Sequence, residues 1–183
     1  MKKIIAIALT LMLLCSATTV LAADMTTPSK TTGDMIWFEV TVENPVEGKE
    51  VNLKPLFGSA FADSELAKAR EAKTVEGYFG EDVAKQITEI VGSNSVSLDE
   101  FMAVYSQGYE EGMGNGNIKS HTPTSYGYGE KAAACFGIIK DGVLTWNVYE
   151  AVGLADGRLE FNVDAETMMA FETETVLFAL CSK

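Results

Sequence analysis

The pattern of apolar and polar residues first indicates strands near the beginning of the chain. Residues 36–42 read Ile-Trp-Phe-Glu-Val-Thr-Val, a β-branched and aromatic run that is typical of a strand. Asn44 and Pro45 end this run, because both residue types favour turns. Residues 51–53, Val-Asn-Leu, are then expected to form a short partner strand.

Two helices are expected next. Residues 62–73 are rich in helix formers, and Asp63 or Ser64 offers a capping side chain. Residues 81–91 place apolar side chains at i, i+4, i+7 and i+8, which fall on one helix face; these are Val83, Ile87, Ile90 and Val91. Gly92 is a natural stop, because glycine readily adopts the left-handed conformation that ends many helices.

Two interpretations of residues 97–109 stay open. Ser97-Leu98-Asp99-Glu100 fits a capping box, which would begin a helix running to Tyr109. The same stretch also alternates in a way that fits a half-buried strand. We favour the strand, because a β-rich region follows directly.

The remaining sequence has mainly the pattern of antiparallel strands. Residues 112–117, Gly-Met-Gly-Asn-Gly-Asn, predict a turn, and Asp-Gly pairs predict two more. A short helical turn over 164–171, capped by Asp164, precedes the last strand. The expected strands are 131–139, 143–149, 158–163 and 175–181.

The segment from about Gly108 to Lys183 resembles small β-sandwich modules of secreted bacterial proteins. The resemblance lies in the order strand, Asp-Gly, Trp-containing strand, Ala-Asp-Gly, strand, short helix, last strand. It implies a sandwich fold and a role in adhesion or presentation, and no functional residue is carried over from it.

These patterns predict an α+β protein with N-terminal strands and two short helices, followed by a C-terminal antiparallel β-sandwich-like region. Residues 35–183 are expected to form a single globular domain, helical over about 60–92 and β-rich over about 97–183. Residues 23–34 are polar and aperiodic, so they predict a flexible leader.

The first 22 residues have the order of features of a secretory signal peptide. Lys2 and Lys3 give a positive start, Ile4–Val20 is almost entirely apolar, and Ala22 ends a segment suited to cleavage. The alternative is an uncleaved membrane anchor, which the processing-like end disfavours. We therefore expect an extracytoplasmic protein, periplasmic or secreted, that does not insert into a membrane after cleavage.

The charge balance narrows the class of partner. The chain carries 14 Lys plus Arg against 26 Asp plus Glu, a formal net charge of −12, and its two arginines are Arg70 and Arg158. Nucleic acids and anionic lipids are bound through clustered cations. We therefore expect neither as a partner.

Two cysteines, Cys135 and Cys181, follow the expected cleavage site. An even pair in an oxidising compartment is a disulfide candidate. The alternative, slightly favoured, is two separately buried thiols, since a bridge also requires Cα atoms within about 7 Å. Each cysteine lies in an apolar run that suits burial.

The groups needed for ordinary catalysis or metal binding are sparse. His121 is the one imidazole, and no Gly-x-Ser-x-Gly elbow accompanies it. Residues 89–100 match a calcium loop poorly, because Val91 and Asn94 stand where an oxygen ligand and a glycine are needed. We expect no metal, no cofactor and no catalytic residue.

Tyr126 and Tyr128 are the candidate ligand-binding residues. Two aromatic side chains in the glycine-rich run Tyr-Gly-Tyr-Gly suit contact with a sugar or a protein, although one of them folding back onto the domain is the simpler alternative. The function expected is that of an exported, non-enzymatic binding or surface-interaction protein whose partner is a protein or a glycan. The alternatives are a carboxylate-based extracytoplasmic hydrolase and a structural accessory subunit.

Overall fold

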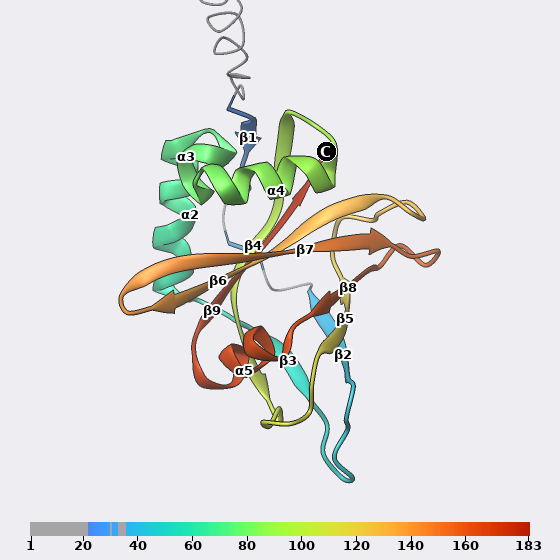
Figure 1. The fold of residues 1–183 in the computed structure, drawn as a ribbon. Helices are drawn as coiled ribbons and strands as arrows, with labels where there is room; N and C mark the ends of the chain where they lie inside the picture. Colours follow the sequence, from blue (N-terminus) through green and yellow to red (C-terminus); the bar gives the residue numbers. More distant parts are fainter. Residues whose placement is uncertain (1–21, 30, 33–35) are drawn as a thin grey trace, which may run out of the picture.

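The computed structural model describes residues 22–29, 31–32 and 36–183, and its main feature is a large curled sheet flanked by helices (Figure 1). Eight of its nine strands join in the order β1-β4-β9-β6-β7-β8-β5-β2, and the ninth, β3, pairs with a second part of β4. Apart from Ala22, the expected signal peptide lies outside the described residues. The elements are β1 (Asp24–Thr26), β2 (Trp37–Val42), β3 (Asn52–Leu56), α2 (Ala60–Ala72), α3 (Val75–Phe79), α4 (Glu81–Val91), β4 (Ser95–Gln107), β5 (Gly116–His121), β6 (Lys131–Lys140), β7 (Val143–Gly153), β8 (Leu159–Val163), α5 (Ala165–Thr173) and β9 (Val176–Ser182).

The middle of the sheet is buried on both faces. All seven residues of β9 are buried, and its side chains alternate between two apolar cores. The outer core lies under helices α2, α3 and α4, whereas the inner core lies within the curl of the sheet beside α5 (Figure 1). The inner core collects residues from β4, β9, β6, β8, β5 and β2, so the curl brings the two ends of the sheet toward each other.

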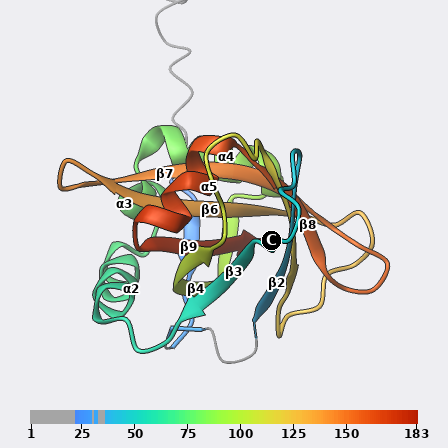
Figure 2. The ribbon, with the colours of Figure 1, turned by 90° about the horizontal axis from the view of Figure 1, so that it is seen from below.

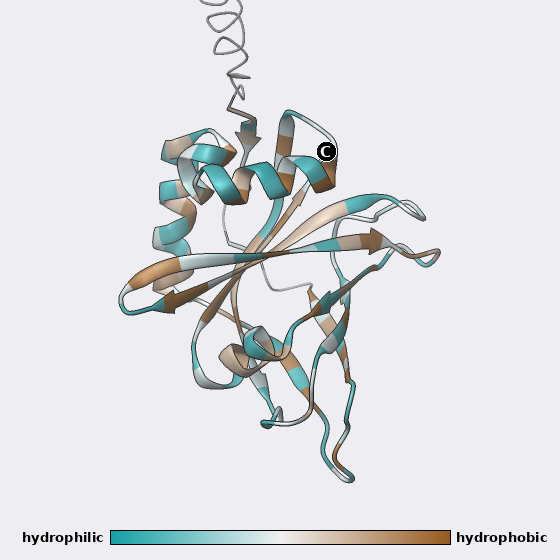
Figure 3. Ribbon diagram, viewed as in Figure 1, coloured by the Kyte–Doolittle hydropathy of each residue, from teal (hydrophilic) through white to brown (hydrophobic). Residues whose placement is uncertain are grey.

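Local sequence explains where the three outer helices begin and end. The side chains of Ser59 and Thr74 accept hydrogen bonds from the first turns of α2 and α3. The apolar stripe of α4 faces the sheet, with Ile87 and Val91 buried, and Gly92 ends the helix with a φ of 67°. Hydrophilic residues alternate with hydrophobic ones along these helices (Figure 3).

The curled sheet has a seam. Strands β2 and β3 are connected through residues 43–51 and lie beside each other (Figure 2), yet no backbone ladder joins them in the described structure. Pro55 of β3 lacks an N–H, and proline is confined to the edges of sheets. The seam therefore coincides with a strand that cannot donate a full set of hydrogen bonds.

The coarse fold prediction is confirmed: the protein mixes helices and strands, and the sheet dominates. The finer expectation of a sandwich is not confirmed, because hydrogen bonding links the strands into one curled sheet. The strand interpretation of residues 97–109 is correct, since β4 covers most of that range. Helices α2 and α4 agree closely with their predictions, while α3 was not predicted.

The start of the expected flexible leader requires correction. Residues 24–26 form β1, which pairs in parallel with β4, and Ala23 and Met25 are buried in the outer core. Backbone hydrogen bonds join Met25 to Lys73 and Val75 to Ala23. A polar, aperiodic sequence is held here because two of its few apolar residues fit under α3. No helix among the described residues is long and apolar enough to cross a membrane.

We predict that Phe136→Ala destabilises the protein strongly. The Phe136 ring lies 4.9–6.0 Å from the rings of four inner-core aromatic residues. Truncating such a ring leaves a cavity and costs about 3–5 kcal/mol of the free energy of unfolding. Urea denaturation measures this loss. The control Phe57→Ala, at a side chain that is 64% exposed, should change stability by about 0.5 kcal/mol or less, and equal effects would contradict the assignment of the core.

Candidate functional site

Strands β2, β5 and β8 turn one side outward without a described helix over it (Figures 1 and 2). Successive residues of a strand point to opposite faces, so their apolar residues enter the inner core and the alternate residues point away from it. We call this outward side the open face. It consists of Trp37, Glu39, Thr41, Asn117, Lys119, His121, Glu160 and Asn162.

One end of the open face is aromatic. Trp37 and His121 are cross-strand partners, and their rings stack with centroids 5.0 Å apart and an interplanar angle of 16°. The Trp37 side chain is 46% exposed although tryptophan is usually largely buried. The pair, here called the aromatic platform, therefore presents an aromatic surface to solvent.

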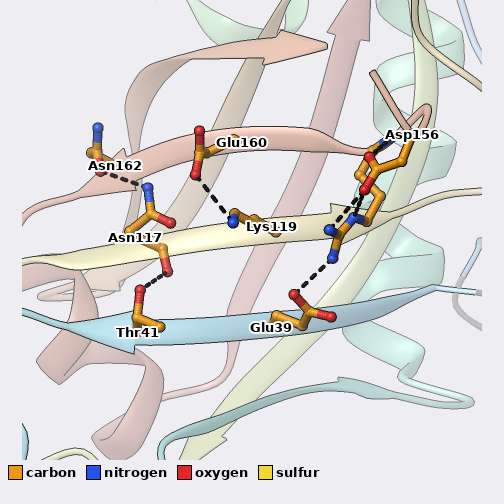
Figure 4. A network of polar contacts seen from close by, with 8 residues as sticks. Glu39, Thr41, Asn117, Lys119, Asp156, Glu160 and Asn162 are labelled. Carbon is orange, nitrogen blue, oxygen red and sulfur yellow. Dashed lines mark hydrogen bonds and ion pairs between the residues drawn. The ribbon is translucent and has the colours of Figure 1, made fainter. Parts of the chain in front are cut away.

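Charged side chains form the middle of the open face (Figure 4). Lys119 Nζ lies 3.7 Å from Glu160 Oε1, between strands β5 and β8. Arg158 lies 2.7 Å from Glu39 and 2.8 Å from Asp156. The Arg158 hydrogen bonds lower the pKa of Asp156. The acidic groups are thus matched by cations, so this face differs from the acidic remainder of the chain.

Amide and hydroxyl groups form the other end of the open face (Figure 4). Asn117 Nδ2 donates to Asn162 Oδ1 at 3.0 Å, and Thr41 Oγ1 donates to the Asn117 carbonyl at 3.5 Å. These amides keep unused donor and acceptor capacity, since each side-chain amide has two N–H groups and an oxygen with two lone pairs.

A groove of about 630 Å³ continues the open face beyond these amides. It is lined by Thr41, Val42, Glu43, Asn115, Gly116, Asn117, Tyr149, Asn162, Val163 and Asp164. The groove lies where β7 and β8 diverge, since these strands pair only through Val152–Glu160 and Gly153–Leu159.

The polar wall of the groove is held by hydrogen bonds between β7 and the start of α5. The Tyr149 hydroxyl contacts Asp164 and lies 2.8 Å from Thr167 Oγ1, and Asn147 Nδ2 donates to the same Oγ1 at 2.7 Å. Burial opposes ionisation of Asp164, but hydrogen bonds from Tyr149 and from the Thr167 N–H lower its pKa overall. Burial and Asp164 raise the pKa of Tyr149, so its hydroxyl stays a donor.

The two candidate tyrosines have different environments. Tyr126 is buried at the end of the inner core, and its hydroxyl donates to Asp99 at 2.7 Å, so a surface ligand does not reach its ring. Tyr128 is 85% exposed. Backbone hydrogen bonds from Gly129 to Gly153 and from Gly153 to Glu130 anchor its loop. That loop directly follows His121, so it begins at the aromatic end of the open face.

Cys135 and Cys181 are free thiols in the structure, and both are fully buried. They lie on the adjacent strands β6 and β9, where Cys135 pairs with Ala179 and Cys181 with Ala133. Both belong to the outer core, so they are diagonal neighbours on one face. Diagonal neighbours are typically about 7–8 Å apart, beyond the usual disulfide range. A hydrogen bond with the neighbouring Cys135 thiol, together with burial, raises the pKa of Cys181.

The remaining chemical candidates do not converge. Glu110 contacts Lys49 at the surface, and the described residues contain no group of three His, Cys, Asp or Glu side chains able to hold a metal. The carboxyl group with a raised pKa, Glu100, lies in the interior and not in the groove. This arrangement gives the hydrolase alternative no support.

Comparisons with protein-family models, with curated proteins and with solved structures find no match to this chain. Function therefore has to be argued from the open face and its groove.

Sequence reasoning did not single out the open face, although part of its signal was present. In the strand at residues 36–42, Trp37 has the same parity as Glu39 and Thr41, which marks it as an exposed tryptophan. Strand β5 was missed because Ile118 is its one large apolar residue, and Gly116 and Ser120 fill the other inward positions. The convergence of β2, β5 and β8 depends on long-range pairing that a single sequence does not encode locally.

We predict that both thiols remain free in the folded, leader-free protein. The expected reaction is slow alkylation under native conditions, because neither sulfur is exposed, and rapid modification of two thiols after unfolding in urea. Mass spectrometry without reducing agent counts the modified groups. A protein mass lower by two hydrogens, with no alkylation after unfolding, would contradict this prediction and indicate a bridge.

Proposed function

We propose that this protein binds a carbohydrate chain, without transforming it, on the open face of β2, β5 and β8. The observation that carries the proposal is the exposed Trp37 ring, stacked on His121 and followed along the same face by amide and paired charged side chains. A sugar ring has an apolar C–H face and a rim of hydroxyl groups. The aromatic platform suits the first, and the polar side chains suit the second.

The charge pattern favours an uncharged chain. Lys119 and Arg158 are each matched by carboxylates on or beside the face, so neither is free to select an anion. The protein as a whole is strongly acidic, which disfavours polyanions. Hydroxyl groups bind as donors and acceptors to both partners of an ion pair and to the free sides of Asn117 and Asn162.

The dimensions of the face suit several sugar units. Trp37 and Thr41 are four residues apart on β2, which corresponds to about 13 Å at roughly 3.3 Å per residue. The groove beside Asn117 and Asn162 prolongs this path, and Tyr149 forms part of its lining. The exposed Tyr128, in the loop that follows His121, is a second aromatic side chain available for stacking.

The proposal keeps two sequence-based expectations, which are export from the cytoplasm and a non-enzymatic role. An exported protein would meet polysaccharides outside the cytoplasm, and a non-enzymatic role needs recognition without a catalytic pair. We also propose that the sandwich-like character lies in the curl itself, with β2-β5-β8 and β4-β9-β6 acting as two layers across the inner core. The packing of Phe38 against Phe178, 5.5 Å apart, supports this view.

The test is affinity electrophoresis and calorimetry of the leader-free protein with neutral glucose, mannose and N-acetylglucosamine oligomers. We predict binding of at least one oligomer and weakening by about two- to tenfold in Trp37→Ala, since aromatic contacts contribute about 0.5–1.5 kcal/mol. Trp37 is a surface residue, so the variant should keep its stability.

Phe57→Ala is the matched control, because Phe57 is also an exposed aromatic residue but lies outside the open face. It should bind as the unmodified protein does. Absence of binding to every oligomer, or equal binding by Trp37→Ala, would overturn the proposal.

A further inference from the structure

Strand β7 is paired along the whole of one edge and along only a short part of the other. Its residues from Val143 to Val152 pair with β6, whereas only Val152 and Gly153 pair with β8. Residues 143–151 therefore have no strand beside them on the β8 side in the described structure. Figure 1 shows β8 diverging from β7 while the β6–β7 hairpin continues to its turn at the other side of the molecule. We call this unpaired part of β7 the free edge.

The free edge carries backbone hydrogen-bonding groups at every second residue. The turn at residues 141–142 has a positive φ at both positions, so Lys140 and Val143, which flank it, form a hydrogen-bonded pair. Odd-numbered residues of β7 thus point their N–H and C=O groups to β6, and even-numbered residues point theirs to the free edge. The far end of the strand agrees, because the Gly153 N–H donates to the Glu130 carbonyl just before β6.

The backbone groups at the free edge have no hydrogen-bond partner among the described residues. They belong to Leu144, Trp146, Val148 and Glu150, none of which is fully buried. The contacts of β7 with α5 come from the side chains of Asn147 and Tyr149 and use no backbone group of the edge. The free edge therefore offers a row of donors and acceptors roughly 20 Å long.

The free edge also lacks the features that protect edge strands from pairing with other chains. Such strands are usually very short, or carry a proline or charged residues. In the described sheet, β1 has three residues and β3 contains Pro55. Residues 143–149, Val-Leu-Thr-Trp-Asn-Val-Tyr, contain neither a proline nor a charge, and they pair with β6 without a register shift. This β-branched and aromatic composition is typical of a strand with neighbours on both sides.

We propose that the free edge is an interface between two copies of this chain, which pair their β7 strands in antiparallel orientation. A two-fold axis at Asn147 gives the register in which every backbone group of the free edge has a partner. Leu144 then pairs with Glu150 of the second copy, and Trp146 pairs with Val148. The two curled sheets become continuous through this interface. The open face lies on β2, β5 and β8, so this proposal and the proposed function do not depend on each other.

The side chains along the free edge favour a second copy as the occupant. Trp146 lies opposite Val148 of the second copy, and both belong to the partly buried rim of the outer core, so an aromatic ring meets a β-branched side chain. Glu150 lies opposite an uncharged leucine and keeps its ion pair with Lys131 of its own chain at 2.8 Å. Like charges therefore do not meet in this register, although the chain as a whole is strongly acidic.

Sedimentation velocity of the leader-free protein over a series of concentrations tests the interface. We predict a reversible monomer–dimer equilibrium. Val148→Pro removes an N–H that the free edge offers but none that β6 uses, so the variant should fold, as a thermal melt checks. Each copy then loses one hydrogen bond across the interface, and the dissociation constant of the dimer should rise about fivefold or more.

Engineered cysteines test the register. Asn147→Cys places a thiol on the two-fold axis, where the opposed Cα atoms of a non-hydrogen-bonded pair are about 4.5 Å apart, within disulfide range. Mild oxidation should then link two chains. Thr145→Cys is the matched control, because its two copies are more than about 13 Å apart and should stay unlinked. The native Cys135 and Cys181 are fully buried and should not react.

Three results would overturn the proposal. The first is a monomer at every concentration, which is also the result expected if the free edge pairs with an extended segment of another protein. The second is equal cross-linking in Asn147→Cys and Thr145→Cys. The third is a dimer that a folded Val148→Pro variant leaves unchanged, since the interface would then lie elsewhere. If Val148→Pro does not fold, the two cysteine variants decide.

Discussion

The architecture depends on the complete burial of strand β9. Seven consecutive buried residues present apolar side chains to both faces of the sheet, so each face needs its own cover. The helices α2, α3 and α4 cover one face. On the other face the sheet covers itself, because its β2-β5-β8 end curls back and α5 fills the remaining space. Because the inward side of those three strands packs on the inner core, their outward side is left exposed.

That exposed side has an unusual composition for this chain. Elsewhere acidic residues greatly outnumber basic ones, but on the open face the charges are paired across strands and an aromatic pair lies at one end. Cross-strand pairs of this type stabilise a sheet by only fractions of a kcal/mol each. Their ordered arrangement matters more as a recognition surface that is preformed before a ligand arrives.

The local elements could largely be predicted from the sequence, and the site could not. The apolar stripe that includes Val83 and Ile87 predicted α4, and the Asp-Gly turn at Asp141 predicted the β6–β7 hairpin. Both predictions depend on residues close together in the sequence. Strand β5 and the placement of residues 24–26 escaped because both depend on distant partners and contain few apolar residues. Tyr126 was a reasonable candidate from composition, but only tertiary structure shows that Asp99 occupies its hydroxyl.

The scant pairing between β7 and β8 has a mechanical consequence. Strands β2, β5 and β8 form a three-stranded unit that joins the remaining sheet through two register pairs of β7, at Val152 and Gly153, and the seam at β2 adds none. The unit is thus joined to the sheet by one short stretch of backbone pairing and by side-chain packing such as that of Phe38 on Phe178. Because few ladder bonds join this unit to the other strands, its attachment depends mainly on the inner core that they share.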